Sequence, residues 1–484
     1  MKRALLASTL CLLVCMSAWG RGEDERPDRV DVAPVSSADP ADVDTADPAA
    51  LGSIPVTVSR SGPWTLRRAP GHGQDRFEEP GRRGGPRPPS APPAERDVDA
   101  SGLDDGGAGG ARAEEAMSAA PSASSRGGER SRRPISGSGQ RQAPLRAGST
   151  DDNAAFDAFL AFVDEQFDSG RVGAWSQRLD VRGRRSLKVL DREGKPVAAA
   201  RVTVLDEAAD RVVWRATTYG DGAAPFYPAV AGVKPGAPLL VDVRVGDARA
   251  RARWDGGGDC VVRLDVPRPE RALALDVCFV IDTTGSMGDE IARIQQSLLA
   301  VTRRLRELGQ EFDLRYAAVL YKDLGDEYLT SAHPFTSDIA AFDQALAAIG
   351  AGGGGDGPES LNQALAVAVN DMSWREGAAR VAFVITDAPP HMDYPGDVPY
   401  GKSLVAAVAR GVRLHAVAAS GLDADGAVVL RQCAQFTRGK FVFVEYGGDV
   451  NASAAAHGVR GPVKGNNLDD ILFEQLRDEV ALMR

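Results

Sequence analysis

A short stretch of the chain, DTTGS at 282–286, places one carboxylate and two hydroxyls on alternate residues. Asp282, Thr284 and Ser286 are hard oxygen donors, and a loop this short can bring all three to one small cation. Because the loop contains neither His nor Cys, the donor set suits Mg²⁺, Mn²⁺ or Ca²⁺ better than Zn²⁺. The stretch therefore predicts a divalent metal site in which water supplies part of the coordination.

Two later aspartates are candidates to complete this site. Asp356 follows a run of four glycines, and Asp387 follows the apolar segment RVAFVIT. Each piece also has a purely structural interpretation, as a helix cap, a flexible turn or a turn cap. Since all three pieces occur in one alternating α/β region, we favour a metal site. Its predicted ligands are Asp282, Thr284, Ser286, Asp356 and Asp387.

The segment before DTTGS, ALALDVCFVI, is a nearly continuous apolar run, as expected of a strand buried on both faces of a parallel sheet. Strand and helix patterns then alternate, which predicts a doubly wound, mostly parallel α/β domain over residues 271–447. Further strands are expected at 314–321, 380–386, 412–420 and 440–445, and helices at 291–305, 339–349, 359–374, 401–409 and 427–436. In such sheets ligands bind at the carboxyl ends of the strands, where Asp282 and Asp387 fall.

DTTGS after a buried strand, and ITD at the end of a later strand, resemble the von Willebrand factor A (vWA) family. The segments YKD at 321–323, GGGGDGPES at 352–360 and TDAPPH at 386–391 are similar to the α-kinase-associated and hemicentin-like variety of that family. The resemblance implies a Rossmann-like fold with a metal-ion-dependent adhesion site (MIDAS). That site has a DxSxS motif, a threonine from a second loop and an aspartate from a third. Together they hold Mg²⁺ or Mn²⁺ and leave one position open for a ligand carboxylate.

The chain matches this MIDAS motif only in part. Asp282 and Ser286 match it, Thr284 replaces a serine with another hydroxyl, and Asp387 matches the last aspartate. The threonine of the second loop is missing.

Asp356 is the best substitute for that threonine, as in the variety just named, and Glu359 and Ser360 stand nearby. A third carboxylate neutralises more of the charge of the ion than a hydroxyl does, which leaves a weaker electrophile for an anionic ligand. The sequence therefore supports metal binding better than adhesion through an acidic residue.

The N-terminus, MKRALLASTLCLLVCMSAWG, is typical of a signal peptide over residues 1–20, because Lys2 and Arg3 precede an apolar run and small residues precede a cleavage point after Gly20. We therefore expect an exported protein in the periplasm, outside the cell or at its surface, with no transmembrane segment in the mature chain. A lipoprotein anchored at Cys15 is the alternative, although the residues before it fit a lipobox poorly.

The regions between the signal peptide and the α/β domain differ in pattern. Residues 21–150, rich in Pro, Gly, Ser and Arg, offer too little apolar surface to fold and are expected to be a disordered linker. Residues 151–180 have the apolar spacing of a short helix. Residues 181–268 alternate with period two between turn signals, which predicts an antiparallel β-sandwich. Their segment LKVLDREGKPVAAARVTVLD resembles the transthyretin-like or carboxypeptidase-regulatory-like family, which implies a non-catalytic spacer or docking module.

The remaining features concern the C-terminus, the thiols and the charge. Residues 466–482 form an amphipathic pattern, and we expect a helix packed on the α/β domain. The three cysteines beyond the signal peptide, Cys260, Cys278 and Cys433, are too few and too widely spaced for a disulfide framework. We expect buried thiols, although one pair could oxidise in an exported protein. The net charge of −10 gives no reason to expect a nucleic acid partner.

The predicted function is protein–protein interaction or adhesion by an exported, metal-binding vWA protein that is not an enzyme. One alternative is a scaffold whose metal site only stabilises the fold. The other is a metal-assisted hydrolase that uses Asp387, His391 and Asp393 in TDAPPHMDYPGD. No nucleophile pattern or second histidine cluster supports the hydrolase, and the glycine run lacks the GK[ST] of a phosphate-binding loop.

Overall fold

The computed structural model describes residues 143–255, 257–265, 267, 273–308, 312–355 and 357–483. The predicted signal peptide, nearly all of the predicted linker and Asp356 lie outside these residues. Within the described ranges, no helix is both long enough and apolar enough to cross a membrane.

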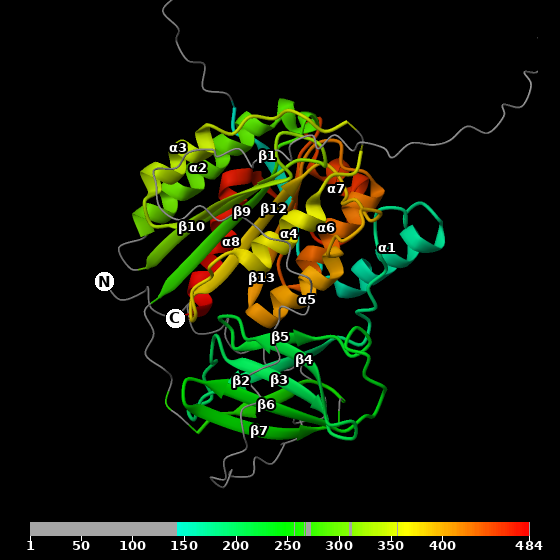
Figure 1. The fold of residues 1–484 in the computed structure, drawn as a ribbon, viewed down its shortest axis with the longest axis vertical. Helices are drawn as coiled ribbons and strands as arrows, with labels where there is room; N and C mark the ends of the chain where they lie inside the picture. The colour runs from blue at the N-terminus through cyan, green and yellow to red at the C-terminus, as the bar shows by residue number, and fades with distance from the viewer. Residues whose placement is uncertain are drawn as a thin grey trace, which may run out of the picture. The chain divides into compact units, whose positions relative to one another are not determined.

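The central sheet has eight strands in the order β11-β10-β9-β12-β13-β14-β1-β15 (Figure 1). Strands β9, β10, β12, β13 and β14 are parallel, whereas β11 pairs with β10, and β1 with β14 and β15, in the antiparallel sense. The predicted doubly wound, mostly parallel sheet is confirmed. The bounds of its strands are β1 Arg146–Thr150, β9 Ala274–Asp282, β10 Asp313–Tyr321, β11 Thr330–Thr336, β12 Ala379–Thr386, β13 Val412–Ala418, β14 Phe441–Val444 and β15 Lys464–Asn467.

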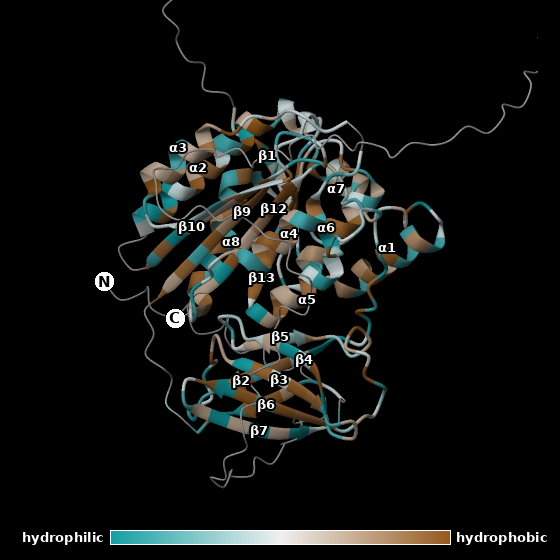
Figure 2. Cartoon of the chain, viewed as in Figure 1, coloured by the Kyte–Doolittle hydropathy of each residue, from teal (hydrophilic) through white to brown (hydrophobic). Residues whose placement is uncertain are grey.

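Strand order reverses at β9, because the chain continues from β9 to β10 on one side and returns to β12 on the other. The side chains of β9 alternate between the two cores, as period two requires. Val277, Phe279 and Ile281 belong to one buried apolar cluster, and Cys278 and Val280 belong to the other. The apolar character of the central strands is visible in Figure 2. This burial on both faces explains why β9 has a continuous apolar sequence.

Helices cover both faces of the sheet. On the face of Phe279 lie α2 (Ile291–Leu308), α3 (Ile339–Ala347) and the C-terminal helix α8 (Leu468–Met483). On the face of Val280 lie α1 (Phe156–Asp168), α4 (Leu361–Ala366), α5 (Tyr400–Arg410) and α6 (Ala424–Phe436). Three short elements complete this domain: the 3₁₀ turn η2 (Gly285–Asp289), the π turn η3 (Val367–Asp371) and α7 (Val450–Ala456).

A β-sandwich lies in the sequence between α1 and β9. Its two sheets, β5-β2-β8 and β4-β3-β6-β7, are joined through aromatic rings, with centroids 5.7 Å apart for Trp214 and Phe226 and 5.2 Å apart for Phe226 and Trp254. The sandwich is mainly antiparallel, as predicted, but strand β2 pairs with β8 in the parallel sense. Alternation reports which face a residue occupies but not the direction of its neighbouring strand. The strand bounds are β2 Arg185–Leu190, β3 Arg201–Asp206, β4 Arg211–Thr217, β5 Ala223–Phe226, β6 Leu239–Val245, β7 Ala248–Trp254 and β8 Cys260–Arg263.

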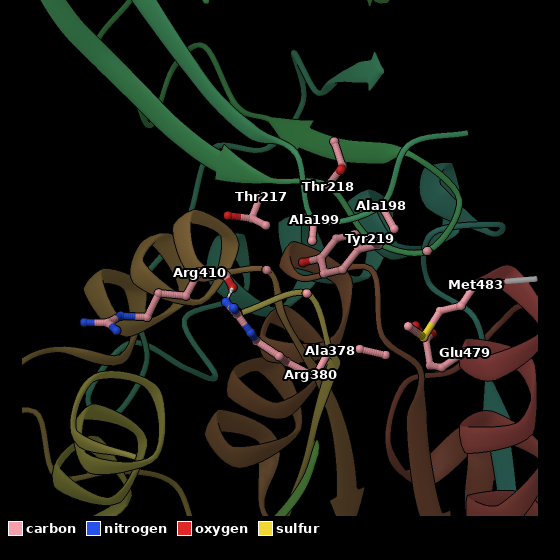
Figure 3. A pocket seen from close by; sticks show the side chains of 14 residues that line it. Ala198, Ala199, Thr217, Thr218, Tyr219, Ala378, Arg380, Arg410, Glu479 and Met483 are labelled. Atoms are coloured by element: carbon pink, nitrogen blue, oxygen red, sulfur yellow. Dashed lines mark hydrogen bonds between the residues drawn. The ribbon is translucent and has the colours of Figure 1, made fainter. Parts of the chain in front are cut away.

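The end of β4 packs directly on the α/β domain. The Thr217 hydroxyl donates to the Ala409 carbonyl at 2.7 Å, and the Arg413 guanidinium lies 4.4 Å from the centroid of the Tyr219 ring. Figure 3 shows Thr217 and Tyr219 facing Arg380 across this contact. The space left between them is about 20 Å³, which is room for one water and no larger ligand.

The predicted end of the linker at residue 150 is wrong. Residues 146–150 form β1, which lies between β14 and β15 in the central sheet, and Ala147 is fully buried there. The sandwich is consequently inserted between two segments of sequence that build the same α/β domain. Composition misplaced this boundary because β1 reads RAGST and its order depends on pairing with two strands that both come after the rest of the sheet in the sequence.

Candidate metal site

The carboxylate of Asp282 is fixed at the end of β9. It is completely buried, and its Oδ1 accepts hydrogen bonds from the Thr284 N–H at 2.9 Å and the Thr284 hydroxyl at 2.6 Å. Its Oδ2 accepts from the hydroxyl of Thr386, the last residue of β12, at 2.7 Å. Both oxygens are thus held by residues at the carboxyl ends of two neighbouring parallel strands.

The hydrogen bonds continue to the loop after β12. The Ser286 hydroxyl lies 3.2 Å from the Thr284 hydroxyl and donates to Asp387 Oδ1 at 3.0 Å. The structure therefore brings four of the five predicted ligands into one connected group, although Asp387 follows Ser286 by 101 residues. The fifth, Asp356, is among the residues that are not described.

The glycine run of the second loop lies against DTTGS. The Gly285 N–H donates to the Gly353 carbonyl at 2.9 Å, and the Gly352 N–H donates to the Thr283 carbonyl at 3.0 Å. Gly354 has φ +70°, and a Cβ there would stand 2.8 Å from Glu359 Oε1 and 3.1 Å from Thr284 Cβ. A side chain at Gly354 would therefore displace the residues that line the site.

Several acids lie close together at this site, and their pKa values are raised. Burial raises the pKa of Glu359 to about 9, and the nearby charges of Asp282 and Asp323 add to the rise. Burial also raises the pKa of Asp387 to about 6, with a further contribution from Asp282. For Asp282 itself, burial raises the pKa against its stabilising hydrogen bonds. These carboxyls hold protons more tightly than usual because burial removes them from water and, for Glu359 and Asp387, neighbouring carboxylates add to the effect, and a cation would relieve that cost.

Within the described residues, no three carboxylate, imidazole or thiol groups are placed so that they could hold a metal ion by themselves. An ion at this position would therefore also use the hydroxyls of Thr284 and Ser286 and water. Oxygen ligands of mixed type with retained water are what Mg²⁺ favours. The side chains present fit a hard divalent cation.

His391 belongs to a neighbouring cluster. Its Nδ1 lies 2.8 Å from Asp393 Oδ1, and its Nε2 lies 3.8 Å from Asp323 Oδ2. Its ring stacks on Tyr394 with centroids 3.9 Å apart and meets the edge of Trp175 at 5.3 Å. The residue is only 4% exposed, so His391 is a buried side chain that packs beside the site.

Sequence reasoning gave no role to two residues that organise the site. Thr386 orients Asp282, and Asp323 accepts hydrogen bonds from the Ser360 hydroxyl at 2.9 Å and the Tyr394 hydroxyl at 2.7 Å. A usable signal existed for both, because each is a polar residue at or just beyond the carboxyl end of a predicted strand.

Residues 276–395 match the family model of the von Willebrand factor A domain. The matched segment includes most of β9, all of β12, and Asp282, Thr284, Ser286 and Asp387. The chain therefore contains a vWA domain, as its motifs predicted.

The similarity to individual proteins is more limited. The alpha-protein kinase vwkA of Dictyostelium discoideum is 30% identical over 139 residues, which are 27% of this chain and 22% of the kinase. The chain thus spans less than a quarter of the length of that relative. Among solved structures, protein BatB of Bacteroides thetaiotaomicron is 16% identical with a TM-score of 0.28, covering 38% of this chain and 95% of BatB. Proximal thread matrix protein 1 of the mussel byssus is 14% identical with a TM-score of 0.30, covering 44% and 46% of the two chains.

Proposed function

We propose that this vWA domain binds a divalent cation and that the loaded site recognises a protein partner. Asp282, Thr284, Ser286 and Asp387 would hold the ion, together with a carboxylate of the second loop, for which Asp356 is the candidate from the sequence. The observation that carries this proposal is the hydrogen-bonded group from Asp282 to Asp387 at the point where strand order reverses.

The cation, when bound, supplies a Lewis-acidic position toward which an acidic group of a partner can be drawn. The residues of the chain provide its orientation. Thr386 keeps Asp282 from rotating, and Ser286 holds Asp387 through a hydrogen bond of 3.0 Å. Because several carboxylates would surround the ion, most of its charge would be neutralised. We therefore expect the surface around the site to contribute more to partner affinity than coordination by one acidic residue.

Export is part of this proposal. The first 20 residues have the charge and apolar pattern of a signal peptide, and the proposed setting is the periplasm, the extracellular space or the cell surface. Interaction with a protein, not catalysis, is the activity proposed.

Thermal unfolding tests the metal site. Mg²⁺, Mn²⁺ or Ca²⁺ at millimolar concentration should raise the melting temperature, because an ion that binds only the folded state stabilises it by about 2.7 kcal/mol at a hundred times its Kd. Asp282→Ala and Ser286→Ala should abolish the shift. Asp289→Ala should preserve it, because Asp289 is exposed in η2. The absence of a shift with all three ions would refute the metal site.

Partner recognition needs a separate measurement. Capture of proteins from the native source should be stronger in Mg²⁺ than in EDTA and should disappear with Asp282→Ala. A melting shift without any metal-dependent capture would favour the alternative of a scaffold in which the ion only stabilises the fold.

A further inference from the structure

Glu359 occupies a fixed position between two loops of the candidate site. Its N–H donates to the Pro389 carbonyl at 2.9 Å, and its carbonyl accepts from the His391 N–H at 3.0 Å. These two bonds attach Glu359 to the loop that follows Asp387. The backbone therefore sets the direction of the side chain, and only 2% of the residue is exposed.

The carboxylate of Glu359 lies among the proposed ligands. Its Oε1 lies near Thr284, because a Cβ built on Gly354 would stand 2.8 Å from Glu359 Oε1 and 3.1 Å from Thr284 Cβ. Its Oε2 is buried and has no hydrogen-bond donor among the described residues. A buried carboxylate oxygen without a donor is destabilising, and a native structure rarely retains one without a reason.

The neighbouring buried acids differ from Glu359 in this respect. Both oxygens of Asp282 accept hydrogen bonds, from Thr284 and Thr386, and both oxygens of Asp323 accept them, from Ser360 and Tyr394. Glu359 is the member of this group that keeps an oxygen without a donor in the part of the chain that the structure describes.

The nearby ammonium of Lys322 is directed to other groups. Its Nζ donates to the Gly352 carbonyl and lies 5.3 Å from the centroid of the Tyr328 ring. A cation bound beside Thr284 would give this oxygen of Glu359 the partner that no donor of the described residues supplies. The ion requires less space than water, because Mg²⁺ contacts oxygen at about 2.0–2.1 Å.

We propose that Glu359, rather than Asp356, is the carboxylate by which the second loop contacts the cation directly. The inference rests on the metal site proposed above and identifies its missing ligand. Glu359 then takes the place of the threonine that the vWA motif leads one to expect. Direct contact of Glu359 with the cation also explains why residue 354 is a glycine, because any side chain there would push the carboxylate away from Thr284.

The test compares two amide substitutions in the full chain, Glu359→Gln and Asp356→Asn, by calorimetric titration with Mg²⁺, Mn²⁺ and Ca²⁺ and by the melting shift that each ion produces. Glu359→Gln should weaken cation binding roughly tenfold or more, and Asp356→Asn should weaken it less. Glu359→Asp keeps the charge, but its side chain is one methylene shorter and holds the carboxylate farther from the proposed ion. It serves as a second variant if the glutamine variant fails to unfold cooperatively, and it should also bind weakly.

An equal loss in the two amide variants, or a larger loss in Asp356→Asn, would overturn the assignment of Glu359 and leave the metal site in place. If the unmodified chain binds none of the three ions, the metal site and this assignment fail together.

Discussion

The carboxylate of Asp152 and the guanidinium of Arg431 form a bidentate ion pair, with Oδ1 2.7 Å from Nη2 and Oδ2 2.9 Å from Nε. Asp152 is 2% exposed and Arg431 is 1% exposed. The same guanidinium donates to the Gly458 carbonyl at 2.9 Å and lies 3.9 Å from the centroid of the Phe162 ring. Asp152 lies between β1 and α1, before the sandwich in the sequence, and Arg431 lies in α6, after it. The pair thus joins the two segments of sequence that the sandwich separates.

Loss of this carboxylate should be strongly destabilising. Asp152→Ala leaves the buried guanidinium of Arg431 without its counter-ion, a change that typically costs about 3–5 kcal/mol. Asp151→Ala is the matched control. Its carboxylate caps the adjacent turn by accepting from the Asn153 N–H at 2.9 Å, and its loss should cost about 1 kcal/mol. Urea unfolding of the two variants measures the difference. Equal losses would mean that the pair does not hold the two segments together.

The stability of the protein should fall in mild acid through His457. Burial, aided by the positive charge of Arg431, lowers the pKa of His457 to about 4. The imidazole of His457 binds a proton near pH 6.5 in the unfolded chain but not in the folded protein. The stability that depends on a neutral His457 is therefore complete above pH 6.5 and is lost as the pH falls toward 4. The shift corresponds to about 3 kcal/mol at 1.36 kcal/mol per pH unit.

The control for this effect is His457→Gln, which cannot titrate in that range. The difference in unfolding free energy between the native protein and the variant should shrink from pH 7 to pH 4. Other groups, including buried His415, whose pKa is also lowered, are present in both proteins and cancel in the comparison. A difference that is constant with pH would contradict the burial of a neutral His457.

The three described cysteines should be inert in the folded protein. Cys260, Cys278 and Cys433 are free and fully buried, and burial raises the pKa of Cys260 and of Cys433 to about 12. Because the thiolate is the reactive form, a disulfide-exchange reagent at pH 8 should react with none of them until the chain unfolds. Rapid reaction of any of the three under native conditions would show local opening around that residue.

The sequence predicted best those elements whose own residues determine their structure. The strand at 274–282 was evident because its apolar side chains fill cores on both sides of the sheet. The edge strand β11, TSAHPFT, was missed because it is half-buried and polar, and its strand structure comes from pairing with β10.

The site was predicted to a similar extent. Asp282, Thr284 and Ser286 share one loop, and Asp387 ends a recognisable strand, so their types and positions were informative. The position of Glu359 depends on a contact with residues that are distant in the sequence, because the Pro389 carbonyl and the His391 N–H fix its backbone. No local pattern in GGGGDGPES indicates which way the side chain of Glu359 points.

Two adjacent glycines of the second loop should respond differently to substitution. Gly354→Ala places a Cβ against Glu359 Oε1 and Thr284 at a residue with φ +70°, whereas a Cβ at Gly355 meets no atom within 4 Å. Gly354→Ala should therefore cost more than 1 kcal/mol, roughly the price of a strained backbone conformation, and should reduce the melting shift caused by Mg²⁺. Gly355→Ala should leave both quantities almost unchanged. If the two variants behave alike, close packing of this loop against Thr284 is incorrect.

A second pair of glycines tests whether residues 146–150 are a strand of the sheet or the end of a linker. Gly148 of β1 and Gly465 of β15 face each other in the sheet. A Cβ on Gly148 would lie 2.4 Å from the ring of buried Phe443, whereas one on Gly465 would make an ordinary contact of 3.4 Å with Val450. Gly148→Ala should consequently lower the unfolding free energy by about 1–3 kcal/mol through overpacking, and Gly465→Ala should change it little. If this segment were a flexible linker, Gly148→Ala would have no effect on the urea midpoint. A clear loss would show that the sequence before the sandwich is an interior part of the vWA sheet.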